Sequence, residues 1–224
     1  MYSFVNTTGA ASPGIGRRER KKLETRRAIS RAALDLALEN GLDNLTVEAI
    51  SEAADVSPRT FFNYFPSKED ALVTDAARIG DELRPLILER PAGESPMQVL
   101  RAVFIEHDPF ALVHANRERA VARQRLLQEH PTLIARQWAQ HSLLERTVSE
   151  AFAERYGVDP AEDLRPALLA GVMGSAVRAA LRRWAGDGTD SLQHLIDTAF
   201  HLLDDGLLTD FSAPAGHTPQ EVHG

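Results

Sequence analysis

The 224-residue sequence predicts an all-α protein of about nine helices in two helical domains, and three observations support this fold class. Apolar residues recur at spacings of three and four along most of the chain, whereas no alternating strand pattern lasts for more than a few residues. Helix-starting residues, followed further on by Pro or Gly breaks, separate the periodic stretches from one another. A hydrophobic content of 43% is sufficient for a sizeable core.

We expect residues 1–16 to form a disordered tail, because they are rich in Gly, Ser, Thr and Ala. This segment has no basic start followed by an apolar run, so it does not resemble a secretory signal, and we expect a cytoplasmic protein. The longest apolar run, residues 167–177, is too short to span a bilayer. The absence of cysteine excludes disulfide bonds, thiol catalysis and cysteine-ligated zinc.

The first helix is predicted from about Arg18 or Leu23 to Asn40, with Gly41 as its stop. Eight basic side chains lie between residues 17 and 31, against two acidic ones. The net charge is −7, but the first 70 residues contain ten basic and ten acidic side chains, so the acidic excess lies further along the chain. Basic residues near a helix start are unfavourable for the helix dipole, so a phosphate partner explains the cluster better than a solvated helix end.

Two helix-start signals follow this helix. Thr46 is a suitable N-cap for a short helix that extends to about Ala54, with Ile50 and Ala53 on its inner side. After a tight turn over residues 55–57, Ser57 is a second N-cap and Pro58 occupies the first helical position.

The next helix is very short, and Phe61 and Phe65 are expected to form its inward face. Its polar N-terminal half then faces outward. Two short helices joined by a tight turn, with the second presenting polar residues, are the arrangement that a helix-turn-helix uses to place one helix in the DNA major groove.

The outward polar residues and the basic cluster give a set of expected DNA contacts. Arg59, Thr60 and Asn63 are expected to read base edges, whereas Ser57, Tyr64 and Lys68 are expected to bind phosphates. The full set is Arg17, Arg18, Lys21, Lys22, Thr46, Ser57, Pro58, Arg59, Thr60, Phe62, Asn63, Tyr64 and Lys68.

The patterns T-V-x-x-I, V-S-x-x-T-F-F-x-Y-F and S-K-E-D-A-L, within residues 46–72, resemble the DNA-binding signature of the TetR family of bacterial repressors. The resemblance covers roughly residues 24–72 and implies a homodimeric, ligand-responsive repressor. Two positions depart from the family pattern. Asp55 stands where the family usually has Gly, although Asp tolerates left-handed backbone angles better than most residues. Phe62 stands where many members have Tyr, so the phosphate contact of that hydroxyl is not expected here.

Only helical patterns follow, so the expected domains are a DNA-binding domain at 17–70 and a ligand-binding and dimerisation domain at 71–205, before a flexible tail at 206–224. A fourth helix is predicted from Lys68 to about Arg84, where Pro85 interrupts it, and we interpret it as the joint between domains. The later helices are predicted at about 96–106, 110–129, 132–156, 161–184 and 191–204.

The last two predicted helices carry apolar stripes that we interpret as a dimer seam. Two such helices from each of two chains would form a four-helix bundle, and palindromic half-sites favour a dimer. The alternative is that both stripes are buried within one chain. The stripes consist of Ala167, Ala170, Gly174, Val177, Leu181 and Trp184, and of Leu192, Leu195, Ile196, Ala199, Phe200 and Leu203.

The helices between are expected to enclose a ligand. His141 and Glu145 interrupt an apolar helical face, and Arg178 lies within an otherwise apolar helix. The alternative is that Glu145 and Arg178 form a structural ion pair and that His141 is a core histidine. The expected ligand-binding residues are Arg123, Gln124, Arg125, Trp138, His141, Leu144, Glu145, Val148 and Arg178.

Residues 115–185, with the pattern R-L-L-x-x-x-P-x-L from Arg125 to Leu133, resemble the regulatory domain of an actinobacterial, mycofactocin-regulator-like branch of the same family. Members of that branch are thought to bind acyl-coenzyme A-like molecules, so the resemblance implies a small apolar or acyl-coenzyme A-like effector. Other members of the family bind antibiotics, dyes or lactones, and the sequence excludes none of these.

Cofactor and metal sites are not expected. No histidine pair has one-turn ligand spacing on a predicted helix, and no phosphate loop or nucleophile elbow is present. An all-α enzyme, or a helical interaction protein with a coincidental helix-turn-helix-like hairpin, is the alternative to a regulator.

Overall fold

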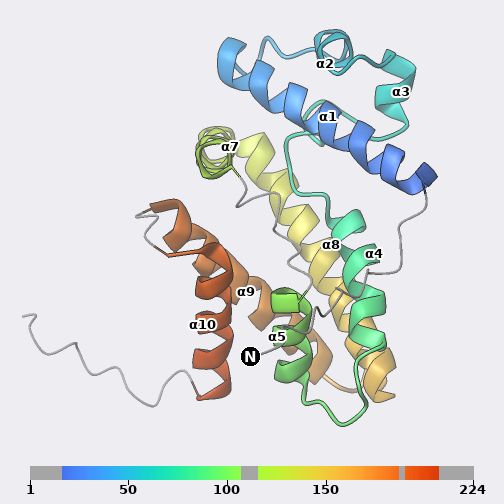
Figure 1. Cartoon of the computed structure of the whole chain (residues 1–224), viewed down its shortest axis with the longest axis vertical. Coiled ribbons are helices and arrows are strands. Elements are labelled where there is room, and N and C mark those ends of the chain that lie inside the picture. Colours follow the sequence, from blue (N-terminus) through green and yellow to red (C-terminus); the bar gives the residue numbers. More distant parts are fainter. Residues whose placement is uncertain (1–16, 107–115, 187–189, 207–224) are drawn as a thin grey trace, which may run out of the picture. The chain divides into compact units, whose positions relative to one another are not determined.

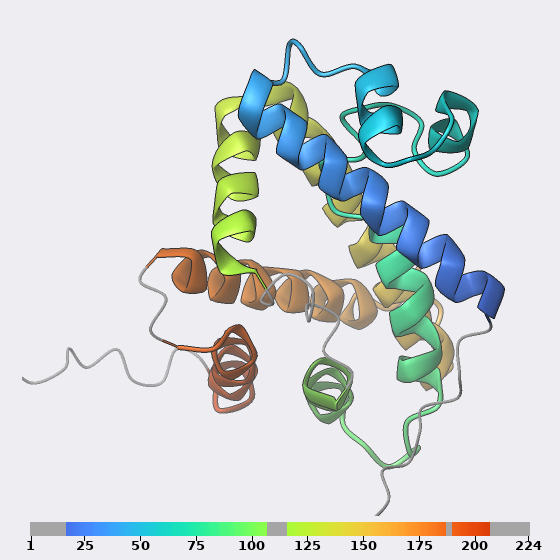
Figure 2. The same cartoon turned by 45° about the horizontal axis from the view of Figure 1, so that its top comes forward.

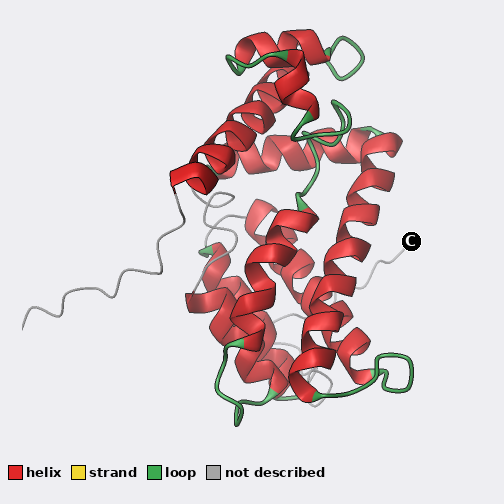
Figure 3. Ribbon diagram, turned by 90° about the vertical axis from the view of Figure 1, so that its right-hand side faces the viewer, coloured by secondary structure: helices red, strands yellow, loops and turns green. Residues whose placement is uncertain are grey.

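The computed structural model describes residues 17–106, 116–186 and 190–206, and all regular structure in these ranges is helical (Figure 3). The predicted fold class is confirmed. The chain divides into two compact units, Met1–Val73 and Thr74–Gly224. None of the described helices has the length and apolar character needed to cross a membrane. The tails expected at 1–16 and beyond Gly206 lie outside the described residues.

The first unit contains α1 (Arg17–Asn40), α2 (Val47–Ala53) and α3 (Pro58–Phe62) (Figure 1). Gly41 ends α1 with a φ of 81°, as expected for a left-handed stop. Both predicted N-caps are confirmed: the Thr46 hydroxyl accepts from the Ala49 N–H at 3.1 Å, and the Ser57 hydroxyl accepts from the Thr60 N–H at 3.0 Å. Local capping chemistry therefore sets the start of both short helices.

The core of the first unit joins α1 to the two short helices, which lie together on one side of α1 in Figure 2. Ile29, Ile50 and Phe61 are completely buried, and Phe65 is nearly so. The expected inner position of Ala53 is wrong, because Ala53 is exposed. Ser51 is buried instead of Ala53, so the inward face of α2 consists of Ile50 and Ser51.

The segment from residue 63 to residue 75 forms turns, so the predicted helix start at Lys68 is wrong. The Ser67 hydroxyl donates to the Asp70 carboxylate at 2.6 Å and also accepts from the Asp70 N–H at 3.3 Å. Such local side-chain hydrogen bonds compete with helix formation. Ala71, Leu72 and Val73 are buried in succession, which a helix with one inner face does not do.

The fourth helix, α4, extends over Ala76–Leu88 and continues through Pro85, which was expected to end it. The Asp75 side chain caps its start by accepting from the Arg78 N–H at 3.3 Å. Pro85 lies on the exposed face together with Asp81, whose carbonyl loses its helical partner and can bond water instead. At the far end, the guanidinium of Arg155 donates to the carbonyls of Ile87 and Arg90.

The second unit also contains α5 (Pro96–Glu106), α7 (Arg117–Glu129), α8 (Pro131–Tyr156), α9 (Arg165–Gly186) and α10 (Leu192–Asp204). Long α8 packs against both α4 and α9, and α10 packs against α9 and α5 (Figure 1). Gly80 allows α4 to approach α8, because a Cβ there would lie 2.9 Å from Cγ2 of Thr147. The start predicted for α9 is four residues early, since Asp159 and Asp163 accept backbone N–H groups in turns before it.

One hydrophobic core lies between these helices, and it corrects the expected dimer seam. Ala170, Val177 and Trp184 of α9 are buried in this core, as are Ile196 and Phe200 of α10. Both stripes therefore pack mainly within the chain, which is the alternative left open by the sequence. Ala167 of the first stripe is exposed, and the large apolar side chains exposed in this region are at other positions: Leu164, Leu168 and Leu202, at 67%, 56% and 52% exposure.

Candidate DNA-binding surface and ligand pocket

Helix α3 presents its polar half to solvent. Arg59 and Asn63 are exposed, and Thr60 and Tyr64 are partly exposed. Phe61 and Phe65 are buried on the opposite side, so the expected inward and outward faces are confirmed. Phe62 is 56% exposed, although its ring stacks edge-on against Phe61, with the ring centroids 5.5 Å apart.

The turn before α3 orients this helix. Asp55 stands where Gly is usual, and its φ of 53° lies in the left-handed region. The hydroxyls of Ser57 and Thr60 lie 2.9 Å apart, so Thr60 is joined to the N-cap as well as partly exposed. Pro58, at the first helical position, is exposed beside them.

Arg26 and Lys68 connect the segment after α3 to α1 and to the loop before α2, because both side chains donate to backbone carbonyls. The Arg26 guanidinium donates to the Tyr64 carbonyl at 2.7 Å and lies 4.3 Å from the centroid of the Phe65 ring. The Lys68 ammonium donates to the Leu45 carbonyl at 2.7 Å. Lys68 therefore has a structural role that the sequence did not indicate, in addition to the phosphate contact expected of it.

The expected basic arm forms the first turns of α1, where Arg17, Arg18, Lys21 and Lys22 are exposed. Thr46 is also exposed at the start of α2. The structure thus places all thirteen expected DNA contacts in the first unit, with Lys68, Thr60 and Tyr64 only partly accessible.

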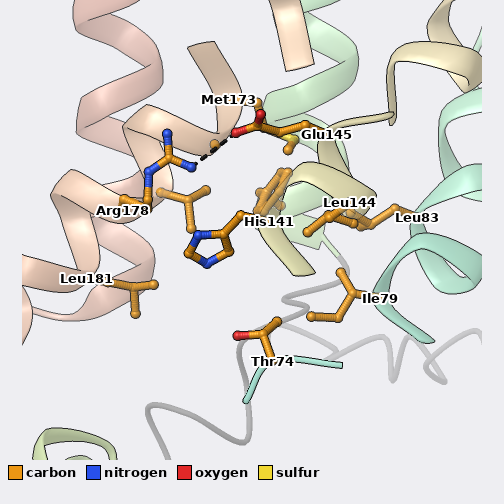
Figure 4. Close-up of a pocket in the computed structure, with 12 residues that line it drawn as sticks. Thr74, Ile79, Leu83, His141, Leu144, Glu145, Met173, Arg178 and Leu181 are labelled. Carbon is orange, nitrogen blue, oxygen red and sulfur yellow. Dashed lines mark hydrogen bonds and ion pairs between the residues drawn. The ribbon is translucent and has the colours of Figure 1, made fainter. Parts of the chain in front are cut away.

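The second unit contains a pocket with about 550 Å³ of empty space, part of it open to solvent (Figure 4). Helices α4, α5, α8 and α9 contribute to its wall, and most of the wall is apolar. The lining residues are Thr74, Ile79, Leu83, Phe104, His141, Leu144, Glu145, Met173, Gly174, Val177, Arg178 and Leu181.

An ion pair forms one polar part of the wall. The Arg178 guanidinium donates to a carboxylate oxygen of Glu145 at 3.1 Å, and both side chains are partly buried. Gly174 makes room for the pair, because a Cβ at this position would lie 2.6 Å from the same Glu145 oxygen. Glu145 and Arg178 are therefore both an ion pair and lining groups of the pocket.

His141 forms the other polar part of the wall. Burial lowers the pKa of its imidazole, and the positive charge of Arg178 lowers it further, which outweighs the opposite effect of Glu145. The ring is therefore neutral near pH 7. Its Nε2 atom lies 2.8 Å from the Gln137 side-chain nitrogen, and its Nδ1 atom is buried without a hydrogen-bond partner in the described part of the chain.

Gln137 and Gln140 connect α8 to the segment before α4. The Gln137 carbonyl oxygen accepts from the Thr74 N–H at 3.1 Å, and its amide nitrogen donates to the Thr74 hydroxyl at 2.7 Å. The Gln140 carbonyl oxygen accepts from the Ala76 N–H at 3.2 Å. Two side chains of α8, three residues apart, thus satisfy backbone donors just before and at the start of α4.

Four of the nine expected ligand residues line this pocket: His141, Leu144, Glu145 and Arg178. Val148 differs from expectation because it is fully buried in the core, and Trp138 differs because it is 57% exposed beside His141. Gln124 and Arg125 are exposed on α7.

The ninth expected residue, Arg123, donates to the Gln137 carbonyl oxygen at 3.3 Å, and burial lowers its pKa to about 10. Sequence reasoning also missed Ile79 and Leu83 of α4, and Met173 and Val177 of α9. The four-residue spacing within each pair indicates an apolar helical face, but it does not show that the two faces enclose a pocket.

An exposed polar helix α3 in one unit and a pocketed helical bundle in the other define a helix-turn-helix protein with a separate helical unit that contains a pocket. Comparison with known proteins agrees with this class. Residues 29–73 match the family described as bacterial regulatory proteins, tetR family, and residues 94–208 match the family described as MftR C-terminal domain. The chain is 32% identical to the HTH-type transcriptional regulator TcmR of Streptomyces glaucescens over 93% of this chain and 95% of TcmR. The chain therefore belongs to the TetR family of transcriptional regulators.

Solved structures share the fold. The FadR repressor of Thermus thermophilus, solved with lauroyl-CoA, superposes with a TM-score of 0.50 at 24% identity, over 85% of this chain and 100% of FadR. The SmeT–triclosan complex gives 0.51 at 20% identity, over 87% of this chain and 99% of SmeT, which is a multidrug efflux pump repressor of Stenotrophomonas maltophilia.

Proposed function

We propose that this chain is a ligand-responsive repressor that binds a palindromic operator as a dimer and is released by a small apolar or acyl-coenzyme A-like effector. The pocket of the second unit is the observation that supports this function most strongly. It is apolar along most of its wall, has a few polar groups, and is bounded by α4, the helix that begins three residues after the DNA-binding unit ends.

The similar proteins support the choice of effector. FadR was solved with an acyl-coenzyme A ester and SmeT with a small apolar drug. The mostly apolar lining of the pocket suits an acyl chain or an apolar drug, whereas the phosphates of coenzyme A would remain outside it. Exposed Arg125 on α7 is then a candidate partner for those phosphates.

Release requires that the effector bind one conformer more tightly than the other. We infer that the favoured conformer holds the two reading helices of a dimer at a spacing that does not match successive major grooves. Helix α4 is the element that connects such a change to the pocket, since Ile79 and Leu83 are both pocket wall and part of α4.

A DNA-binding assay tests this function. A fluorescent operator fragment, selected from genomic DNA by the purified protein, would be titrated with protein in the presence of lauroyl-CoA, free coenzyme A or triclosan. Lauroyl-CoA or triclosan should weaken operator binding at least tenfold, and coenzyme A alone should not. Operator affinity that no compound changes would contradict the sensor function, while still leaving a DNA-binding protein.

The dimer is proposed to use the outer faces of α9 and α10, because their inner stripes are buried in the chain's own core. Leu168 and Leu202 are exposed apolar residues on these outer faces. Leu168→Glu or Leu202→Glu should give a monomer in sedimentation experiments and abolish operator binding, because both half-sites must be occupied together. Arg146→Glu, at an exposed position of α8, is the control. A dimer that survives both leucine changes would place the interface elsewhere.

A regulator that binds DNA in a bacterial cell is expected in the cytoplasm, and regulation rather than catalysis is also what the names of the similar proteins indicate.

A further inference from the structure

The side-chain amide of Gln137 has a fixed orientation. Its oxygen lies 3.1 Å from the Thr74 N–H nitrogen and 3.3 Å from a guanidinium nitrogen of Arg123, and both of these groups can only donate. The opposite orientation would place the amide protons against two donors. Nε2 of Gln137 is therefore the atom that faces the Thr74 hydroxyl at 2.7 Å and the His141 ring at 2.8 Å.

This orientation determines where the proton of His141 lies. An amide nitrogen donates and does not accept, so Nε2 of His141 must be the acceptor of the 2.8 Å contact. A neutral imidazole that accepts at Nε2 has its proton on Nδ1. A doubly protonated ring would direct an N–H at another N–H, which excludes the imidazolium form in this arrangement.

The proton on Nδ1 has no acceptor among the described residues, although the atom is buried and the residue lines the pocket. An unsatisfied buried donor is unfavourable, and a ligand that supplies an acceptor removes that penalty. The second lining donor is Thr74, whose hydroxyl accepts from Gln137 and retains its own proton to donate.

The charges of the pocket indicate an uncharged ligand. The carboxylate of Glu145 and the guanidinium of Arg178 are paired at 3.1 Å, so an anionic ligand would have to compete with Glu145 and a cationic one with Arg178. The remaining wall is apolar apart from His141 and Thr74. An apolar body with a carbonyl, ether or hydroxyl oxygen matches this combination.

We propose that His141 donates its Nδ1 proton to an uncharged oxygen acceptor on the effector, and that Gln137 transmits this contact to Thr74. The chain of atoms begins at the ligand oxygen, passes through both ring nitrogens and the Gln137 amide, and ends at the first residue of the ligand-binding unit. Hydrogen bonds in series strengthen one another, so an acceptor at Nδ1 makes Nε2 a better acceptor for Gln137. This proposal rests on the proposed function, since it names the ligand class of that pocket.

Gln140 provides a matched control for Gln137. It lies three residues further along α8, has the same side chain and also accepts from a backbone N–H, that of Ala76, the first residue of α4. This bond does not include His141. Gln140→Leu should therefore remove a cap of the same kind without interrupting the chain from the pocket.

The first test is the tautomer of His141 in the full-length protein, measured by NMR with ¹⁵N-labelled histidine. We expect the Nδ1–H tautomer in the wild type and in Gln140→Leu, and a shift toward the Nε2–H form in Gln137→Leu. An Nε2–H tautomer in the wild type would overturn the proposal.

The second test uses benzophenone, which has a carbonyl acceptor, and diphenylmethane, which has the same skeleton with a methylene group in place of the carbonyl. Benzophenone should bind the wild type about tenfold more tightly, and this preference should vanish in His141→Phe. Benzophenone should change the exchange rate of the Thr74 amide in the wild type and in Gln140→Leu, but not in Gln137→Leu.

Three results would overturn the proposal. They are equal binding of the two compounds to the wild type, a preference that survives His141→Phe, and binding of neither compound. Release of DNA by lauroyl-CoA would in those cases still support the proposed function. Conversely, failure of every compound to change operator affinity would contradict the proposed function even if the tautomer and the binding preference were as expected.

Discussion

The carboxylate of Glu145 on α8 and the guanidinium of Arg178 on α9 meet at 3.1 Å beside Gly174. A Cβ at position 174 would have no space next to this pair. The ion pair of the pocket wall therefore occupies the space that a side chain at position 174 would need. Figure 4 shows the pair beside His141, Leu144 and Met173.

Gly174→Ala should lower the free energy of unfolding by about 1–3 kcal/mol, because the new methyl group lies 2.6 Å from a Glu145 oxygen and forces the pair apart. Gly171→Ala, on the same helix, is the control: its Cβ meets nothing within 4 Å, and alanine favours a helix by about 1 kcal/mol. Urea denaturation of both variants measures the difference. If Gly174→Ala proved as stable as Gly171→Ala, the pair would not need the space.

The lowered pKa of His141 predicts a pH dependence of stability. Above the ordinary pKa of 6.5, the ring is neutral in both the folded and the unfolded chain and contributes nothing. Below pH 6.5, the unfolded chain binds a proton that the folded chain resists, so the free energy of unfolding falls until the pH reaches the lowered pKa. The loss is about 1.4 kcal/mol for each unit by which folding lowers the pKa.

Denaturation of the wild type and of His141→Phe between pH 7.5 and pH 5 checks this effect. As the pH falls through about 6.5, the free energy of unfolding of the wild type should fall relative to that of His141→Phe. Parallel curves for wild type and His141→Phe would show that His141 titrates as it does in the unfolded chain.

Lys68→Met should lower the stability of the first unit by about 1–2 kcal/mol, because it removes the ammonium that donates to the Leu45 carbonyl at 2.7 Å. If Lys68 also binds a phosphate, its loss should weaken binding to all DNA sequences and flatten the salt dependence. Thermal unfolding and salt-dependent binding separate the two roles. An unchanged melting temperature would mean that the hydrogen bond contributes nothing.

Asp55→Gly should raise stability by about 0.5–1 kcal/mol, because Asp55 has a φ of 53° that glycine adopts without steric cost. Asp43→Gly is the control, since Asp43 is exposed and has no positive φ, and glycine there only increases the entropy of the unfolded chain. Chemical denaturation that ranks Asp43→Gly above Asp55→Gly would show that the turn is not strained.

The elements that the sequence predicted well depend on local chemistry. Thr46, Ser57 and Pro58 set helix starts through contacts within three residues, and Gly41 sets a helix end through its own backbone angle. The inward face of α3 followed from the spacing of Phe61 and Phe65 for the same reason. The predicted reading helix could therefore be placed correctly before any tertiary contact was known.

The errors arose where distant residues decide the outcome. Helical periodicity shows that Ile196 and Phe200 are buried, but it does not show whether a second chain or the same chain covers them. At the start of α4, the N–H groups of Thr74 and Ala76 donate to side chains of α8, Gln137 and Gln140, and no local pattern reveals these contacts. Thr74 and Ile79 were missed as pocket residues because only the packing of α4 against α8 shows which of its faces lines the pocket, although the opposite wall at His141 and Arg178 was predicted.

Binding of the purified protein to DNA tests whether α3 reads the base sequence. Fragments selected from genomic DNA would be compared, by fluorescence anisotropy at several salt concentrations, for wild type and Arg59→Ala. We expect a palindromic site with half-sites about 34–36 Å apart. We also expect Arg59→Ala to lose about 1–3 kcal/mol of binding free energy and to have a relaxed base preference. Selection of no preferred sequence by the wild type, or an unchanged preference in Arg59→Ala, would contradict the assignment of α3 as the reading helix.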